Sequence, residues 1–210
     1  MGTFPSYRFE SIRQRADQIR QTYAKNPNSI PVDIDHIVEF GYGLEVRPLK
    51  NLKSSLDMEG MLSKDRTTIF VDSATYTDDR FYNRHRFTLA HEIGHYELHS
   101  DYYKRAQFET PNEWVQLLQS IDPDELEWCE RHADEFAGRL LVPIEFLTRE
   151  IDALRPELRR LEKMAMDIGI DNVDEVQKRK GVYVARMIAP KFEVSQRVIE
   201  IRVRTEKINL

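Results

Sequence analysis

The feature of this sequence that most constrains its fold is the motif His91-Glu92-Ile93-Gly94-His95. Residues four apart lie one turn apart on the same face of an α-helix, so both imidazoles can reach one metal ion at about 2.0–2.1 Å. Glu92 is rotated by about 100° from His91, which places it beside the metal. The motif therefore predicts a helix that carries two zinc ligands, His91 and His95, with Glu92 as a general base acting on water.

The residues around the motif favour a partly buried helix over 85–99. Phe87, Ala90, Ile93 and Leu98 form an apolar stripe at helical spacing. Gly94 costs such a helix roughly 1 kcal/mol relative to alanine. A small residue at this point allows another backbone or a substrate to approach closely, which gives the glycine a reason to be there.

A catalytic zinc ion usually keeps three protein ligands and one water, so a third ligand is expected elsewhere in the chain. Residues 122–141 predict a helix, with Asp122 as N-cap and a proline at the first helical position. Glu130 is the candidate third ligand. Asp134, one turn later, is placed to accept the second ring N–H of a ligating histidine. Three other residues stay open as the third ligand: His132, Glu135 and His99.

Three further residues near the motif have candidate roles. Tyr96 and His99 follow the motif and are candidates to stabilise an oxyanion. Cys129 is interpreted as a small buried residue. Because it is the only cysteine, it excludes an intrachain disulfide and favours a reducing, cytoplasmic setting. The apolar runs are far shorter than the roughly 20 residues of a membrane span, so no membrane association is expected.

The periodicity along the chain predicts helices on both sides of a short stretch with strand character. Residues 8–23 predict an amphipathic helix, and residues 32–40 a second, shorter one. Residues 44–46, 60–63 and 67–71 predict three short strands, of which the last two form a hairpin. The rest of the chain is expected to be helical. The predicted fold class is α+β: a mainly helical minimal metallopeptidase fold with a small three-stranded sheet packed on the motif helix.

Two domains are expected, a metallopeptidase domain over 1–155 and a C-terminal helical extension with a basic tail over 156–210. A net charge of −5 does not favour nucleic-acid binding by the whole chain. Residues 178–207, however, contain nine Lys/Arg against three Asp/Glu, and residues 194–198 could open a recognition helix. A non-proteolytic zinc-containing regulator that binds DNA or a repressor is therefore an alternative. A structural zinc site is normally closed by four protein ligands, which argues against it.

Two stretches around the candidate ligands, together with a third near the C-terminus, resemble the ImmA/IrrE family of metallo-endopeptidases. The stretches are RFTLAHEIGHY over 86–96, ExxADxFAxxLLVP over 130–143 and IAPKFxVSxxV over 188–198. The resemblance covers roughly residues 8–207 and implies a compact gluzincin-like fold. It also implies that His91, His95 and Glu130 hold a catalytic zinc ion and that Glu92 is the base.

The same resemblance implies that the substrate is a protein, typically a separately encoded transcriptional repressor or another regulatory protein. Two positions depart from the family pattern: His132 stands where an acidic residue is frequent, and Asp134 where asparagine is common. Neither departure removes a ligand. An inactive scaffold that serves as a toxin–antitoxin component is a further alternative, although the intact motif argues against degeneration. Two histidines and a carboxylate suit zinc, and manganese and iron stay open as the metal.

Overall fold

The computed structural model describes residues 5–169 and 172–210. The chain divides into two compact units, Met1–Leu141 and Val142–Leu210, which are described in turn. This division precedes the boundary expected after residue 155. All of the motif residues and the candidate third ligands lie in the first unit.

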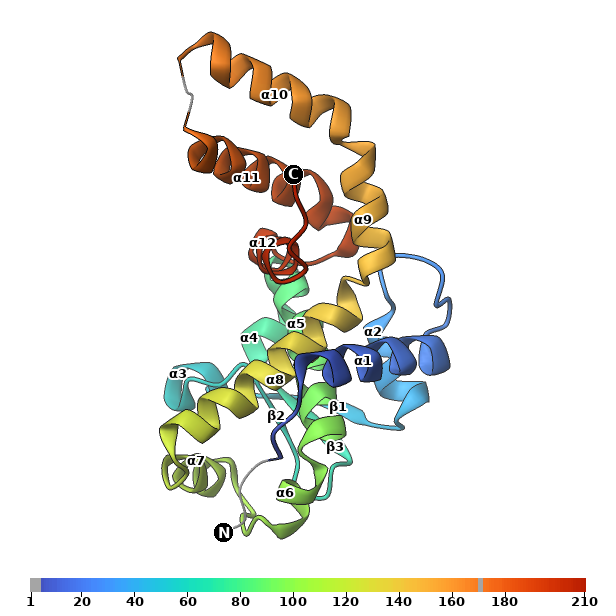
Figure 1. Cartoon of the computed structure of the whole chain (residues 1–210). Helices are drawn as coiled ribbons and strands as arrows, with labels where there is room; N and C mark the ends of the chain where they lie inside the picture. Colours follow the sequence, from blue (N-terminus) through green and yellow to red (C-terminus); the bar gives the residue numbers. More distant parts are fainter. Residues whose placement is uncertain (1–4, 170–171) are drawn as a thin grey trace. The chain divides into compact units, whose positions relative to one another are not determined.

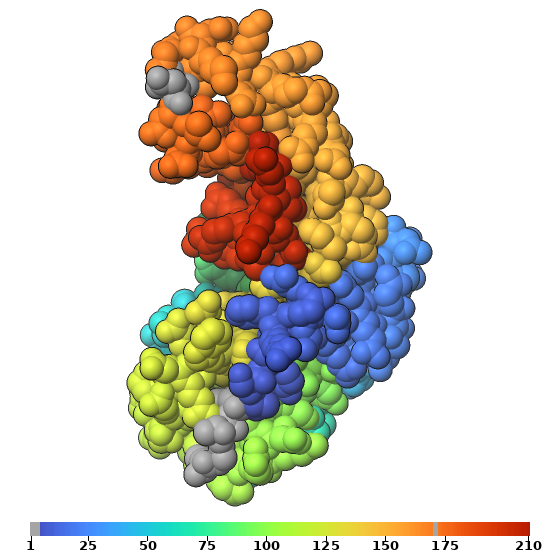
Figure 2. Space-filling view, viewed as in Figure 1, coloured from blue at the N-terminus to red at the C-terminus, as the bar shows by residue number. Residues whose placement is uncertain are grey.

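The first unit begins with the predicted amphipathic helix, α1 (Phe9–Tyr23), which buries Ile12, Ala16 and Ile19. Two ion pairs join α1 to α8 (Pro123–Leu141): Arg13 with Glu135 at 2.7 Å and Asp17 with Arg139 at 2.8 Å. α1 packs against α8, and it lies, in blue, on the face of the first unit that Figure 2 shows. The second predicted helix consists of a short α2 (Ile34–His36) continued by a π-helix, η1 (Ile37–Gly41).

The three predicted strands form one mixed sheet with the order β1-β3-β2 (Figure 1). β3 (Thr68–Asp72) is central, pairing in parallel with β1 (Glu45–Leu49) and antiparallel with β2 (Gly60–Leu62). The β2–β3 hairpin lacks a glycine in its connection, and Arg66 takes the left-handed conformation with φ 57° instead. β2 is an edge strand among the described residues, and it packs against α5 (Tyr82–Leu98).

The helix that carries the motif is α5 (Tyr82–Leu98), and its main partner is α8 (Pro123–Leu141). Gly94 lies at their contact. A Cβ atom built on Gly94 would lie 3.1 Å from the Cα atom and 3.2 Å from the carbonyl oxygen of Ala133. The glycine therefore allows the two helix backbones to approach closely, as its position in the motif predicted. Asp122 begins α8 as expected, because its side chain accepts hydrogen bonds from the N–H groups of Asp124 and Glu125.

Short helices complete the first unit. Thr110 caps α7 through a capping box with Glu113, and Pro111 opens that helix. The short elements are α3 (Leu52–Leu56), α4 (Ser73–Thr77), the 3-10 helix η2 (Asp79–Phe81), α6 (Ser100–Arg105) and α7 (Pro111–Gln119).

The second unit is entirely helical among the described residues. It consists of α9 (Ile144–Ala153), α10 (Arg155–Asp167), α11 (Val173–Phe192) and α12 (Gln196–Thr205). Because α9 packs against α10 and α11, it belongs to this unit and not to the first. Arg202 of α12 is buried, pairs with Glu206 at 2.8 Å and donates to the carbonyl of Val142. The structure thus confirms the predicted class, a mainly helical α+β fold with a small three-stranded sheet.

Candidate metal centre and active site

Three donor atoms from α5 and α8 meet in one pocket of the first unit. The Nε2 atoms of His91 and His95 lie 2.9 Å apart. Carboxylate oxygens of Glu130 lie 3.2 Å from Nε2 of His91 and 3.6 Å from Nε2 of His95. Atoms bound tetrahedrally at about 2.0–2.1 Å from one ion are about 3.3 Å apart, so this set fits a zinc ion. Two imidazoles and a carboxylate are also donors that zinc accepts readily.

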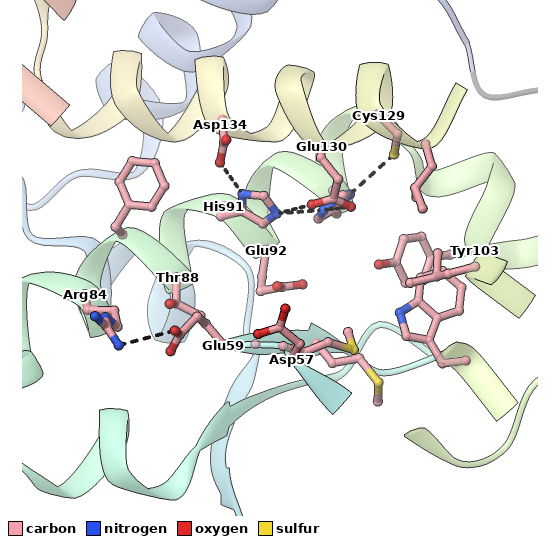
Figure 3. Close-up of a pocket in the computed structure, with 18 residues that line it drawn as sticks. Asp57, Glu59, Arg84, Thr88, His91, Glu92, Tyr103, Cys129, Glu130 and Asp134 are labelled. Carbon is pink, nitrogen blue, oxygen red and sulfur yellow. Dashed lines mark hydrogen bonds and ion pairs between the residues drawn. The ribbon is translucent and has the colours of Figure 1, made fainter. Parts of the chain in front are cut away.

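Asp134 lies one turn after Glu130, with a carboxylate oxygen 2.9 Å from Nδ1 of His91. Because a carboxylate accepts, Nδ1 of His91 is the protonated nitrogen, and its Nε2 lone pair faces Glu130 and His95. Figure 3 shows this chain of contacts from Asp134 through His91 to Glu130. The sequence predicted Asp134 as the acceptor for a ligating histidine, and in the structure its carboxylate lies against His91.

The charges around His91 favour a cation at this point. Burial lowers the pKa of His91, but the hydrogen bonds to Asp134 and Glu130 outweigh burial and hold that pKa well above its usual value. Burial likewise raises the pKa of Glu130, yet His95 and His91 reverse this and hold it far below its usual range. A proton or a metal cation satisfies the same carboxylates, so metal binding at this site would release a proton.

Glu92 is almost completely buried and lines the same pocket. Burial raises the pKa of its carboxyl group, and the nearby His95 and His91 offset part of that shift. A raised pKa suits a general base, because proton transfer is most efficient when the pKa lies near the working pH. A Cβ atom built on Gly60 of β2 would lie 3.0 Å from Oε1 of Glu92 and 2.5 Å from Cγ2 of Thr88. A glycine is therefore needed where β2 passes over α5.

The pocket that contains these residues has a volume of about 500 Å³. One wall comes from β2 and the turn before it, over residues 57–61, and the opposite wall from α6, α7 and α8. Tyr103 of α6 stands in that opposite wall, and its hydroxyl points into the cavity toward Glu92 (Figure 3). Its ring packs in a cluster with Trp114 at 5.0 Å and Phe108 at 6.4 Å, centroid to centroid.

Tyr103 was not predicted from the sequence as a site residue. Its side chain is 2% exposed, and burial together with the charge of Glu92 raises its pKa well above the usual value. The phenol thus keeps its proton at neutral pH and can donate a hydrogen bond into the pocket. Tyr103 comes eight residues after His95 in the sequence. It reaches the pocket because α5 ends at Leu98 and α6 turns back toward the metal centre.

The two sequence candidates for oxyanion stabilisation lie elsewhere. Tyr96 packs edge-on against the ring of Tyr42 at 5.0 Å, with the guanidinium of Arg66 over its other side at 5.0 Å. It is not among the residues that line the pocket. His99 is completely buried, and burial lowers its pKa to about 2, with a further contribution from His95. Its Nδ1 atom lies 2.9 Å from Nδ1 of His95, on the nitrogen of that ring opposite to Glu130.

The alternatives to Glu130 as third ligand point away from the two Nε2 atoms. Glu135 pairs with Arg13 of α1. His132 stacks on His99 with 6.1 Å between ring centroids and lines a separate pocket with Tyr7, Phe9 and Trp128. Cys129 is buried, as interpreted from the sequence, with its Sγ atom 3.4 Å from Nδ1 of His99. Within the described residues, Glu130 is the acidic side chain that joins His91 and His95.

Comparison with known protein families gives evidence that is independent of this geometry. Residues 82–204, more than half of the chain, match the peptidase M78 family, described as the IrrE N-terminal-like domain. The chain belongs to this family. The match begins at the first residue of α5 and ends within α12, so it contains the motif histidines and the glutamate helix. A search of curated proteins found no match.

Membership in the M78 family establishes a metallopeptidase-type function and a protein substrate. It agrees with a site in which two histidines and a glutamate can hold a metal ion. The described part of the chain contains no helix with the length and hydropathy that a membrane span requires.

Proposed function

We propose that the protein is a zinc-dependent endopeptidase that cleaves a separately encoded regulatory protein, with a transcriptional repressor as the first candidate. The observation that carries this proposal is the convergence of His91 Nε2 and His95 Nε2, 2.9 Å apart, on the Glu130 carboxylate, whose Oε2 lies 3.2 Å from His91 and whose Oε1 lies 3.6 Å from His95. The buried carboxylate of Glu92 lines the same open pocket. A structural zinc site would be closed by a fourth ligand and would not need this base.

In this proposal His91, His95 and Glu130 hold the zinc ion, and Asp134 fixes the ring of His91. When bound, zinc supplies Lewis acidity, which polarises the scissile carbonyl and acidifies water. Glu92 takes a proton from the water that attacks the carbonyl carbon and delivers it to the leaving amine. Tyr103, whose hydroxyl faces Glu92 across the pocket, donates a hydrogen bond to the carbonyl oxygen as negative charge develops there.

The sheet supplies a way to align the peptide. β2 pairs with β3 on one side, and its residues Gly60 and Met61 line the pocket. An extended peptide added along the free side of β2 would make main-chain hydrogen bonds and pass over α5. Alignment by main-chain contacts suits a substrate that is unfolded or locally extended at the cleavage site.

The DNA-binding alternative has less support in the second unit. Ser195 precedes α12 and caps it, because its side chain accepts a hydrogen bond from the N–H of Val198, in agreement with the helix start predicted within residues 194–198. Arg202 of α12, however, points into its own unit, where it pairs with Glu206. Arg202 is therefore not available to contact a DNA groove, as a cation on a recognition helix would be. The free thiol of Cys129 also fits the cytoplasmic setting that a repressor substrate requires.

The experiment that tests the proposal compares the zinc-loaded wild type with Glu92→Gln in a cell extract. New protein N-termini are identified by mass spectrometry, and metal content is measured for both proteins by elemental analysis. We expect about one zinc per chain in both proteins and new N-termini, including one in a DNA-binding regulator, with the wild type alone. Equal sets of N-termini from both proteins would refute the role of Glu92, and an inactive, zinc-loaded wild type would refute the peptidase.

A further inference from the structure

A second set of contacts lies on the other ring nitrogen of His95. Nδ1 of His95 is 2.9 Å from Nδ1 of His99, and Sγ of Cys129 is 3.4 Å from the same His99 atom. His99 lies one turn after His95, at the C-terminal end of α5, and is completely buried. The mechanism above uses neither His99 nor Cys129.

Two nitrogens 2.9 Å apart make a hydrogen bond only if one carries a proton and the other accepts it. A neutral His95 that binds metal through Nε2 must carry its proton on Nδ1. His99 must then accept at Nδ1 and carry its own proton on Nε2. Sγ of Cys129 lies beside this hydrogen bond, 3.4 Å from Nδ1 of His99 and 3.9 Å from Nδ1 of His95.

We infer that His99 is a positioning residue: its Nδ1 atom accepts the Nδ1–H of His95 and so holds the Nε2 lone pair of His95 on the metal centre. This inference rests on the metal centre of the proposed function. The two ligands are thus fixed by different means. His91 donates to the carboxylate of Asp134, which is 60% exposed, whereas His95 donates to a neutral ring inside the protein.

The difference in burial explains the difference in acceptor. A carboxylate at position 99 would add an ionised group in a fully buried place, which costs far more than burying a neutral group with its hydrogen bond made. A neutral imidazole accepts the same proton without adding charge. The four-residue spacing places it on the same helix face as His95.

His95, His99 and Cys129 could also hold a metal ion by themselves, because their donor atoms lie within 4.8 Å of one another. Such a site would require Nδ1 of His95 and the thiol of Cys129 to lose their protons in the protein interior. Burial disfavours the thiolate. The hydrogen-bonded arrangement needs neither proton to leave, so the geometry favours it, and the second metal site becomes an outcome of the test.

Two substitutions at position 99 separate acceptance of the hydrogen bond from filling of space. In His99→Asn, Oδ1 can occupy the place of Nδ1 and accept from His95, whereas His99→Leu fills the space without an acceptor. Zinc affinity is measured for each by competition with a chelating dye. We expect His99→Leu to bind zinc about 10–100-fold more weakly than the wild type and His99→Asn to recover most of that loss.

Thermal unfolding of the metal-free proteins is the control. If His99 had a purely structural role, its replacement would lower the unfolding temperature and leave the zinc affinity per folded chain unchanged. That result would overturn the inference. A long-range ¹H–¹⁵N spectrum of the zinc-loaded wild type provides a readout that does not require a variant. We expect His95 as the Nδ1–H tautomer and His99 as the Nε2–H tautomer, and the reverse assignment for His99 would overturn the inference.

Two zinc ions per wild-type chain, with a thiolate-to-metal band in the cobalt-loaded protein that Cys129→Ser removes, would show a metal site at the cluster and would also overturn it. Failure of the proposed function looks different. A wild type that binds no zinc refutes the metal centre, and the inference with it, before any variant is compared. A wild type that binds zinc but cleaves nothing refutes the peptidase and leaves the test of His99 intact.

Discussion

Replacing Gly94 with alanine tests whether the close contact between α5 and α8 is needed to build the metal centre. A Cβ atom at this position would lie 3.1 Å from Cα and 3.2 Å from the carbonyl oxygen of Ala133, and 3.3 Å from Cδ1 of Phe136. Optimal separations between carbon atoms are about 3.5–4.0 Å. Two of the three atoms belong to the backbone of α8, which cannot rotate away, so the helices must separate by a few tenths of an ångström.

The magnitude follows from two opposing contributions. Alanine is favoured over glycine in a helix interior by about 0.8–1.0 kcal/mol. Overpacking a tight contact costs about 1–3 kcal/mol. Gly181 of α11 is a matched control, because the nearest atom to a Cβ built there lies 4.0 Å away, on the side chain of Leu210. Gly181→Ala therefore has the gain without the cost, and we expect the two variants to differ by about 1–3 kcal/mol.

The assay is urea unfolding of the metal-free proteins, followed both by tryptophan fluorescence and by far-ultraviolet circular dichroism. Both tryptophans, Trp114 and Trp128, lie in the first unit, so fluorescence follows that unit, and far-ultraviolet circular dichroism follows all of the helices. We also expect weaker zinc binding in Gly94→Ala, because α8 carries Glu130 away from α5. Equal stabilisation by the two substitutions, with unchanged zinc affinity in Gly94→Ala, would refute the reasoning.

Three further predictions concern single side chains. Tyr103→Phe removes one donor to the oxyanion, so it should keep zinc and lower kcat by about 10²–10³-fold with little change in KM. Steady-state kinetics on an identified substrate measure this, and an unchanged kcat would contradict the role of Tyr103. Asp134→Ala should weaken zinc binding by about 10–100-fold, because Nδ1 of His91 loses its acceptor, and chelator competition measures this directly. Glu150 of α9 bonds Lys191 at 2.6 Å, which, against some desolvation, lowers the pKa of that carboxyl. A lowered pKa in the folded state stabilises the fold at neutral pH, and this stabilisation is lost as the pH falls through the lowered pKa. Glu150→Gln should therefore cost about 0.5–1 kcal/mol at pH 7 and less at pH 4, and an equal cost at both values in urea unfolding would disprove the assignment.

Periodicity and caps allowed much of the fold to be predicted from the sequence. The apolar spacing of α1 and the Asp122 cap of α8 each have a local physical cause, and both elements lie where they were expected. Thr110, Pro111 and Glu113 carry an equally local signal for the start of α7. The boundary between the two units was harder to predict, because it depends on which helices α9 packs against and not on any residue at the junction.

The candidate site was predictable in proportion to how much of it lies on one helix. His91, Glu92 and His95 share α5, so their spacing alone predicts their relation. Glu130 and Asp134 required the pairing of two helices, for which Gly94 was the only local signal. Tyr103 could not be predicted as a site residue without knowing that the chain turns at His99. This residue is both the C-cap of α5 and the N-cap of α6. Tyr96 follows His95 directly in the sequence, but adjacent residues of a helix face different directions. Its side chain therefore does not line the pocket.

The matched region contains the candidate metal ligands and Glu92, but it does not contain the pocket wall over residues 57–61. The matched region starts at residue 82, so it includes α5, α6 and α8, which together provide the candidate ligands, Glu92 and Tyr103. The wall over residues 57–61 comes before it, and so does the free side of β2 along which a peptide would lie. Gly60 is the exception, because its missing side chain makes room for Glu92. In the proposed function, the peptide therefore lies against residues that precede the matched region, whereas the metal centre is built from residues inside it. Gly60 is the one position on this wall whose replacement would also disturb the metal centre, because a side chain there would displace Glu92.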